Sequence, residues 1–183
     1  MKKILALMLA LAMLLGCTAL AEDAAPALTK DLVILFTSDA HCGIDSGFGY
    51  AGLATVRDVL AAKNHVILVD NGDAIQGEPV GTMTKGEAIV ELMNAVGYEV
   101  AIPGNHEFDY GMDNFLGLVE KANYPYISAN FTHNGELVFQ PYVIKEYDGV
   151  KVAFVGVTTP KTFTSSTPTY FQDGNGNYIY GFS

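Results

Sequence analysis

Hydrophobic residues occur in two kinds of run after residue 30, and the alternation of the two kinds predicts the fold. Three runs are continuous and rich in β-branched residues, as in strands buried on both faces of a parallel sheet. These runs are 31–38 (DLVILFTS), 65–70 (HVILVD) and 98–103 (YEVAIP). After each of them, apolar residues recur every three or four positions, as on one face of a helix. They are Leu53, Val56 and Leu60, then Ile89, Met93 and Val96, then Phe115, Leu118 and Ala122. This order predicts an α/β domain.

Three further patterns follow the last predicted helix. The run 124–130 (YPYISAN) predicts a fourth strand beside the first three. Two strand-like runs in 142–159 flank the pair Asp148-Gly149, and an Asp-Gly pair between such runs favours a tight hairpin turn. The stretch 163–183 is rich in Thr, Ser, Gly and Asn, so we expect a loop there.

The beginning of the chain differs in composition from the rest. Two lysines precede the apolar run ILALMLALAMLLG, and small and then acidic residues follow it, as in a secretory signal. Two processing sites compete: LLGC is similar to a bacterial lipobox, which would attach a lipid to Cys17 and hold the protein at a membrane, whereas the Ala-Leu-Ala at 19–21 suits ordinary signal peptidase. We expect a signal peptide over 1–21, a domain over 31–183 and an exported protein, either periplasmic, cell-surface or secreted.

Charge and cysteine content narrow the possible partners. The 183 residues carry a formal charge of −10, which repels a phosphate backbone and argues against a nucleic-acid partner. A small anionic substrate could still bind where metal ions reverse the local charge. Besides Cys17 the chain has only Cys42, so no disulfide is expected within the exported domain, and we expect Cys42 to be a small buried side chain beside His41.

Polar side chains follow the first three predicted strands. Asp39 and His41 come just after the first strand, Asp73 just after the second, and Asn105 with His106 just after the third. The carboxyl ends of neighbouring parallel strands meet at one edge of the sheet, where ligands bind. Carboxylate, imidazole and amide ligands together suit Zn²⁺, Mn²⁺, Fe or Mg²⁺. The pattern therefore predicts a metal site, with Asn105 on the metal and His106 facing a bound ligand.

The same residues lie in three motifs of a known family. The motifs FTSDAHCG (36–43), VDNGDAIQGEPVG (69–81) and IPGNHEFDYG (102–111) resemble, in order and spacing, those of the amino-terminal metallophosphoesterase (calcineurin-like) domain of bacterial 5′-nucleotidases and UDP-sugar hydrolases. The similarity covers roughly 31–160. It implies a secreted or surface hydrolase of phosphate esters, folded as a sandwich of two mixed β-sheets flanked by helices, with two divalent metal ions.

The resemblance also implies individual metal ligands. Carried over by motif, Asp39 and His41 would bind the first metal, Asp73 would bridge both metals, and Asn105 would bind the second. A carboxylate suits the bridging position because it can neutralise two cations. A neutral amide at Asn105 avoids a further negative charge where an anionic ester must approach. A lone Asp-x-His after a strand is more often a turn, but the two other motifs favour the ligand interpretation.

The motif GNHEFD implies the catalytic residues. His106 would be the catalytic histidine, and Asp109 would orient it. Asp109 fits equally well as an acidic residue near the start of the helix that follows. For Glu107 we expect hydrogen bonds that close the turn rather than substrate contact, and for Asp70 a supporting role at the end of its strand.

Two features of the family are missing. The family completes its metal pair with later Gly-His and Gly-His-x-His or Gly-His-x-Gln motifs, and this sequence has no histidine after His133. The carboxy-terminal domain that recognises the nucleoside is also not found. We therefore expect an amino-terminal piece of such an enzyme, incomplete at its C-terminus, whose second metal has too few ligands for tight binding.

Two classes of function remain. The preferred one is a metal-dependent hydrolase of phosphate esters, most simply of extracellular nucleotides, with cyclic-nucleotide phosphodiesterase or UDP-sugar hydrolase activity as the nearest rivals. The other is a non-catalytic exported module that keeps the fold for binding. Complete later histidine motifs in the parent gene would favour the enzyme.

Overall fold

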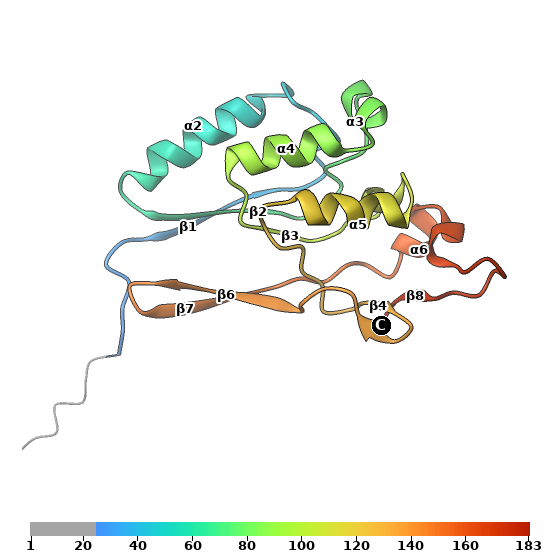
Figure 1. Cartoon of the computed structure of the whole chain (residues 1–183). Helices are drawn as coiled ribbons and strands as arrows, with labels where there is room; N and C mark the ends of the chain where they lie inside the picture. Colours follow the sequence, from blue (N-terminus) through green and yellow to red (C-terminus); the bar gives the residue numbers. More distant parts are fainter. Residues whose placement is uncertain (1–24) are drawn as a thin grey trace, which may run out of the picture.

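The computed structural model describes residues 25–183. The predicted signal peptide over 1–21, with Cys17, lies outside the described residues. Within the described part, no helix has the length and apolar character needed to cross a membrane. Three layers are visible: helices, a parallel sheet, and a lower layer of antiparallel strands (Figure 1).

The parallel sheet and its covering helices form as the hydrophobic pattern predicts. The strands lie in the order β1-β2-β3, and each neighbouring pair is parallel. Helices α2, α4 and α5 lie on one side of this sheet, α3 lies beyond its carboxyl edge, and the 3₁₀ turn η1 follows β3 (Figure 1). The elements of this half are β1 (Leu32–Thr37), α2 (Gly49–Ala61), β2 (His65–Asp70), α3 (Pro79–Thr84), α4 (Glu87–Val96), β3 (Val100–Ala101), η1 (His106–Phe108) and α5 (Met112–Lys121).

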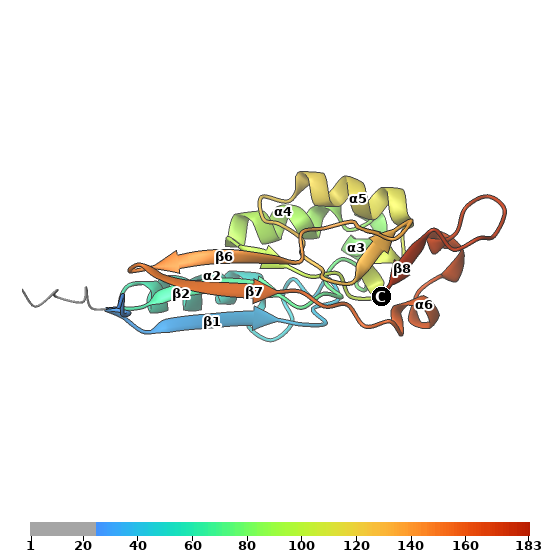
Figure 2. The same cartoon turned by 90° about the horizontal axis from the view of Figure 1, so that it is seen from below.

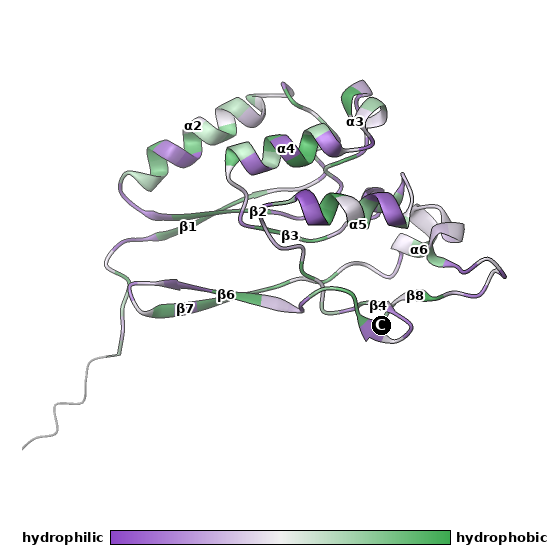
Figure 3. Ribbon diagram, in the orientation of Figure 1, coloured by the Kyte–Doolittle hydropathy of each residue, from purple (hydrophilic) through white to green (hydrophobic). Residues whose placement is uncertain are grey.

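The main core lies between the helices and the sheet. Apolar positions alternate with polar ones along α4 and α5, as expected for helices with one buried face (Figure 3). Ile89, Met93 and Phe115 are fully buried there, and the aromatic ring of Phe108 packs against that of Phe115 at 5.1 Å. Val56 is an exception to the predicted helix face, because it is 40% exposed on α2.

The predicted hairpin forms the layer on the other side of the parallel sheet. Strands β6 (Tyr142–Tyr147) and β7 (Val150–Val155) are antiparallel, and the turn residues Asp148 and Gly149 have φ angles of 52° and 83°, a left-handed pair that suits a tight hairpin. Figure 2 shows the hairpin running alongside β1 and β2. A small second core joins these layers, with Ile67, Val100 and Ile127 buried and Val143 and Phe154 packed against them.

Two strand predictions need correction. Residues 124–130 form no continuous strand; they make one parallel bridge, between Ala101 and Tyr126. The first strand was expected to be buried on both faces, yet Ile34 and Phe36 are 48% and 65% exposed. Side chains two residues apart on a strand point to the same face, so Ile34 and Phe36 share one face of β1, and among the described residues that face is only partly covered.

The stretch 163–183 is more ordered than the loop we expected. It lies largely in short elements that pack on the rest of the domain, where Phe171 is fully buried and Phe182 is nearly so. β8 pairs antiparallel with β4, which also pairs with β5. The elements are β4 (Phe131–His133), β5 (Glu136–Leu137), α6 (Thr162–Ser165), η2 (Pro168–Phe171) and β8 (Tyr180–Phe182). Short elements with many Gly, Thr and Ser show no clear periodicity in sequence, so their secondary structure is determined by tertiary packing.

Candidate metal centre

The predicted site residues lie on three loops that leave the same edge of the parallel sheet. Backbone hydrogen bonds extend the β1–β2 pairing into two of these loops: Asp39 N–H donates to Gly72 C=O (3.0 Å) and His41 N–H to Asp73 C=O (3.0 Å). The third loop follows β3 and carries η1. Its His106 N–H donates to Asp73 Oδ1 at 2.8 Å, so all three loops are joined by hydrogen bonds.

The backbone of the first two loops has unusual torsion angles. Asp39, His41 and Asp73 have positive φ angles of 54°, 45° and 59°, and so does Cys42 at 60°. Residues with a Cβ rarely occupy this left-handed region, and such residues cluster at functional sites. The tight turns at the ends of β1 and β2 therefore set the directions of these side chains, and the left-handed torsion angles strain the local backbone. Cys42 itself is buried next to His41, as expected, and burial raises the pKa of its thiol to about 11.

Three side chains gather where the loops meet. His41, Asp73 and His106 each offer a ligand atom, and these atoms all lie within 4.8 Å of one another. The two imidazole rings meet edge to face with their centres 4.9 Å apart. Two nitrogens and a carboxylate oxygen at this spacing, all half-buried, form a donor set that fits a divalent transition metal.

The hydrogen bond of His41 fixes which of its nitrogens could bind a metal. Its Nδ1 lies 3.0 Å from the backbone carbonyl oxygen of Gln76. Because a carbonyl oxygen only accepts, Nδ1 must carry the proton and donate. Nε2 therefore keeps its lone pair, and a carbonyl behind a metal-binding histidine is a common way to fix this tautomer.

Glu107 holds the loop after β2 and the loop after β3 together. Its side chain is fully buried, and its carboxylate accepts the backbone N–H groups of Asp73 (2.8 Å), Ala74 (2.9 Å) and Gly104 (2.6 Å). Burial raises the pKa of Glu107, and the three N–H groups oppose that shift by stabilising the charge. Glu107 thus closes the turn by hydrogen bonds, as the sequence predicted.

His106 is coupled to Asp109 within η1. The His106 Nδ1 lies 2.6 Å from Asp109 Oδ2. Partial burial lowers the pKa of His106, but the hydrogen bond and negative charge of Asp109 outweigh it, so the pKa lies above its ordinary value. A histidine with a raised pKa carries a proton more readily near neutral pH, as a proton donor must.

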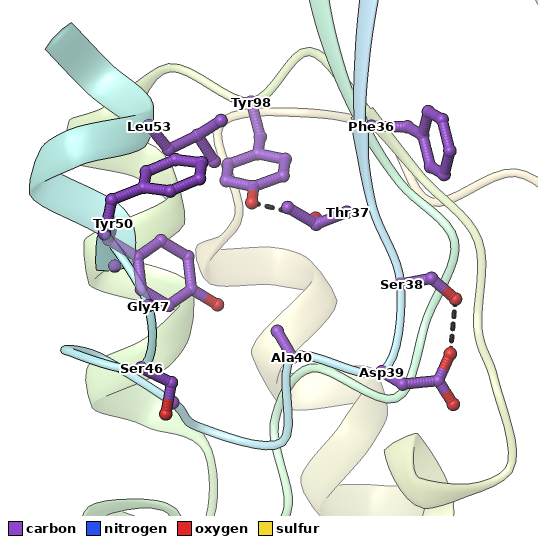
Figure 4. Close-up of a pocket in the computed structure, with 13 residues that line it drawn as sticks. Phe36, Thr37, Ser38, Asp39, Ala40, Ser46, Gly47, Tyr50, Leu53 and Tyr98 are labelled. Carbon is purple, nitrogen blue, oxygen red and sulfur yellow. Dashed lines mark hydrogen bonds between the residues drawn. The ribbon is translucent and has the colours of Figure 1, made fainter. Parts of the chain in front are cut away.

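Asp39 lies on the first loop and is not a member of the close group of three, and Asn105 lies on the third loop, next to His106. The exposed Asp39 carboxylate accepts a hydrogen bond from Ser38 Oγ (2.5 Å), at one end of a pocket of about 510 Å³ lined by Phe36, Tyr50 and Tyr98 among others (Figure 4). Asn105 precedes η1, half-buried, and its carbonyl oxygen accepts the N–H of Phe108.

Asp70 supports the site from the end of β2. Its carboxylate accepts the Thr37 hydroxyl (2.6 Å) and the Gly72 N–H (2.9 Å). Burial raises the pKa of Asp70 to about 7, against the opposing effect of the Thr37 hydrogen bond. This carboxylate links the ends of β1 and β2 directly behind the loop that carries Asp73.

Comparison with known proteins decides the family. The calcineurin-like phosphoesterase model matches residues 32–173, which include all three loops. The chain belongs to this family. It is 36% identical over 159 residues to a snake venom 5′-nucleotidase of Gloydius brevicauda, and 34% identical over 176 residues to the trifunctional nucleotide phosphoesterase YfkN of Bacillus subtilis. These matches cover 75% and 78% of this chain, but only 27% and 12% of the two relatives, so the chain spans a small part of their length.

Solved structures agree on the fold of this chain. The crystal structure of YfkN has a TM-score of 0.65 and 31% identity, covering 74% of this chain and 51% of that one. A 5′-nucleotidase precursor from Thermus thermophilus has a TM-score of 0.69 and 26% identity, covering 83% of this chain and 32% of that one. The predicted α/β metallophosphoesterase fold is therefore confirmed.

The sequence did not indicate every group that shapes this candidate site. The Gln76 carbonyl behind His41 is a backbone atom, so no residue type could have signalled it. His106 also lies closer to His41 and Asp73 than we expected. The motif implied a catalytic role for His106, whereas the structure places it in the group of possible metal ligands. The Gly-Asn-His motif fixes the order of these residues but not their distances.

Proposed function

We propose that this chain is the amino-terminal metal-binding part of an exported phosphoesterase that hydrolyses nucleotides with two divalent cations. The observation that supports it best is the meeting of His41, Asp73 and His106 at the carboxyl edge of the sheet, in a chain of the calcineurin-like phosphoesterase family. The relatives named 5′-nucleotidase and nucleotide phosphoesterase favour nucleotides as substrates. Export rests on the predicted signal peptide over 1–21 or a lipid on Cys17.

The proposed roles follow the motifs. Asp39 and His41 would hold one cation, Asp73 would be shared with a second, and Asn105 would offer its amide oxygen to that second cation. Divalent cations in such a site neutralise phosphoryl oxygens and make water a better nucleophile. The Gln76 carbonyl keeps the Nε2 of His41 free of a proton, and Glu107 holds the Asp73 loop against the loop that carries Asn105.

His106 supplies the proton in this proposal. Its Nδ1–H is directed to the Asp109 carboxylate, so Nε2 is the atom that faces the site. In the protonated imidazole both nitrogens donate, and Nε2–H can stabilise a phosphoryl oxygen or protonate the leaving oxygen. The negative charge of Asp109 keeps that protonated form accessible near neutral pH.

Phosphate release from defined substrates tests the proposal. The protein is expressed from its complete native reading frame and incubated with AMP, UDP-glucose or 2′,3′-cyclic AMP in the presence of Mn²⁺, Zn²⁺ or Mg²⁺. The products measured are inorganic phosphate and adenosine from AMP, UMP and glucose 1-phosphate from UDP-glucose, and ring-opened 2′- or 3′-AMP from the cyclic nucleotide. We expect phosphate from AMP, abolished by EDTA. Ring-opened 2′- or 3′-AMP without phosphate release from AMP would assign a phosphodiesterase, and no product from any of the three substrates, with metal still bound, would favour a non-catalytic binding module.

A further inference from the structure

The carboxylate of Asp109 contacts two distant parts of the chain. Its Oδ2 faces Nδ1 of His106 at 2.6 Å, and its Oδ1 accepts a hydrogen bond from Ser166 Oγ at 3.2 Å. Ser166 is 57 residues further along the chain and belongs to none of the three metal-site motifs. Hydrogen bonds thus connect Ser166 to His106 through one carboxylate.

Ser166 is held in place by the packing around it. It directly follows α6, and its N–H donates to the carbonyl of Thr162 at 3.0 Å. Close by in the chain, Phe171 is fully buried and its ring lies 5.0 Å from that of Phe108, the residue that precedes Asp109. Phe163 in α6 packs on Phe171 at 5.2 Å. The aromatic contacts therefore fix the α6 segment against η1, and with it the position of the Ser166 hydroxyl.

A carboxylate with a single partner has rotational freedom. The terminal torsion of an aspartate is broad, and either oxygen can face a neighbouring donor. Two donors on opposite oxygens remove that freedom. With Oδ1 bound to Ser166, Oδ2 is left to accept the His106 Nδ1–H, which keeps the proton on Nδ1 and the lone pair of the neutral ring on Nε2.

We propose that Ser166 is a positioning residue for the catalytic histidine, acting through Asp109. The proposal rests on the proposed role of His106 in the phosphoesterase. At 3.2 Å the serine contact is longer than the 2.6 Å contact of the histidine, so Ser166 governs the orientation of the carboxylate rather than its charge. Supporting groups of this kind commonly change activity by about 10–100-fold.

The tautomer of His106 provides a test that does not depend on activity. The metal-free chain is labelled with ¹⁵N-histidine, and the imidazole nitrogen shifts are recorded in EDTA at a pH where the ring is neutral. Wild type is expected to hold the proton mainly on Nδ1. Ser166→Ala should lose part of that population to the Nε2–H form, whereas Ser166→Thr, which keeps the hydroxyl, should retain it. Ser165→Ala is the matched control, because Ser165 is the exposed neighbour.

Comparison of Ser166→Thr with Ser166→Val separates the hydroxyl from the shape of the side chain. A tautomer population equal to wild type in both Ser166→Ala and Ser166→Val would overturn the proposal. In the protein from its complete reading frame, kcat on AMP should fall about tenfold in Ser166→Val with KM unchanged, and an unchanged kcat would also count against it. If wild type releases no phosphate, the proposed function fails, but the tautomer measurement still decides the role of Ser166.

Discussion

At the scale of single residues, the site depends on buried carboxylates that lie outside the group formed by His41, Asp73 and His106. Glu107 is the clearest, because three backbone N–H groups from two loops converge on one fully buried carboxylate. Removing such an acceptor leaves buried donors unpaired, and each unpaired donor costs about 1–3 kcal/mol. The rigidity of the Asp73 loop therefore depends on Glu107, a side chain that lies beside the group of possible metal ligands without belonging to it.

Glu107→Gln should destabilise the fold by a few kcal/mol. The glutamine can present only one oxygen to three N–H donors, and its amide group turns further donors toward them. Urea unfolding of the metal-free chain measures the change in free energy of unfolding. Glu120→Gln, at an exposed position of α5, is the control and should be within about 0.5 kcal/mol of wild type. Equal midpoints for both variants would show that the three hydrogen bonds contribute nothing.

His106→Ala separates the two roles that its position allows. If His106 donates a proton, the variant of the complete protein should lose about 10²–10⁴-fold in kcat while Mn²⁺ affinity is retained. His133→Ala, at an exposed position of β4, serves as the histidine control and should keep wild-type turnover. A loss of Mn²⁺ affinity comparable to that of Asp73→Ala would instead make His106 a metal ligand. Its position within 4.8 Å of the ligand atoms of His41 and Asp73 also permits that role.

At the scale of elements, the loops after β2 and β3 touch backbone to backbone. Gly72 has a φ of 90°, and a Cβ placed there would lie 2.3 Å from the Gly104 nitrogen. In the same way a Cβ on Gly104 would lie 2.3 Å from Asp73 Oδ1. Both glycines are therefore needed for the close approach that brings Asp73 beside η1.

Gly72→Ala should lower the free energy of unfolding by about 1–3 kcal/mol or more, through both torsional strain and the clash with Gly104. Gly117→Ala is the matched control: Gly117 lies within α5 with open space around its Cα, so alanine should stabilise the helix by about 0.5–1 kcal/mol. Opposite signs for the two variants are the expected result in thermal or urea unfolding. A neutral Gly72→Ala would mean that the loops do not need this approach.

At the scale of the whole molecule, stability should depend on pH through Asp70. Burial raises its pKa from 3.8 to about 7, so the folded chain holds this proton more tightly than the unfolded chain does. Between about pH 4 and pH 7 the unfolded state loses the proton first, so the free energy of unfolding falls as pH rises, and the penalty is complete above about pH 7.

Asp70→Asn should flatten that part of the pH profile. Urea unfolding is measured from pH 4 to pH 8 in EDTA, so that no cation contributes to the charge of Asp70. Asp58→Asn, an exposed aspartate on α2, is the control and should keep the wild-type slope. A profile for Asp70→Asn parallel to wild type would assign the pH dependence to other groups.

The sequence predicted those parts of the fold that a local pattern of residues specifies. The strands at 31–38 and 65–70, the three main helices and the Asp148-Gly149 hairpin all follow from periodicity or turn chemistry. The segment 163–183 could not be predicted, because its short elements exist only through contacts such as Phe171 on Phe108. The exposure of Val56 and Phe36 depends on whether other parts of the fold cover them, and the local sequence pattern does not specify this.

The same distinction holds for the site. The motifs led to the three loops and to every residue of the close group, because parallel strands bring their carboxyl ends together. Spacing in sequence could not specify the 4.8 Å grouping, the Gln76 carbonyl or the serine behind Asp109. Those depend on left-handed backbone at Asp39, His41 and Asp73, and on a segment more than fifty residues away.

The most direct test of the account is where a divalent cation binds. Substoichiometric Mn²⁺ is added to the ¹⁵N-labelled chain, and the broadening of each backbone amide signal is measured for wild type and Asp73→Ala. We predict strong broadening that is confined to 39–41, 72–74 and 104–107 in wild type and lost in Asp73→Ala. Broadening spread over acidic surface residues, and equal in the two proteins, would contradict a metal centre at the ends of β1, β2 and β3.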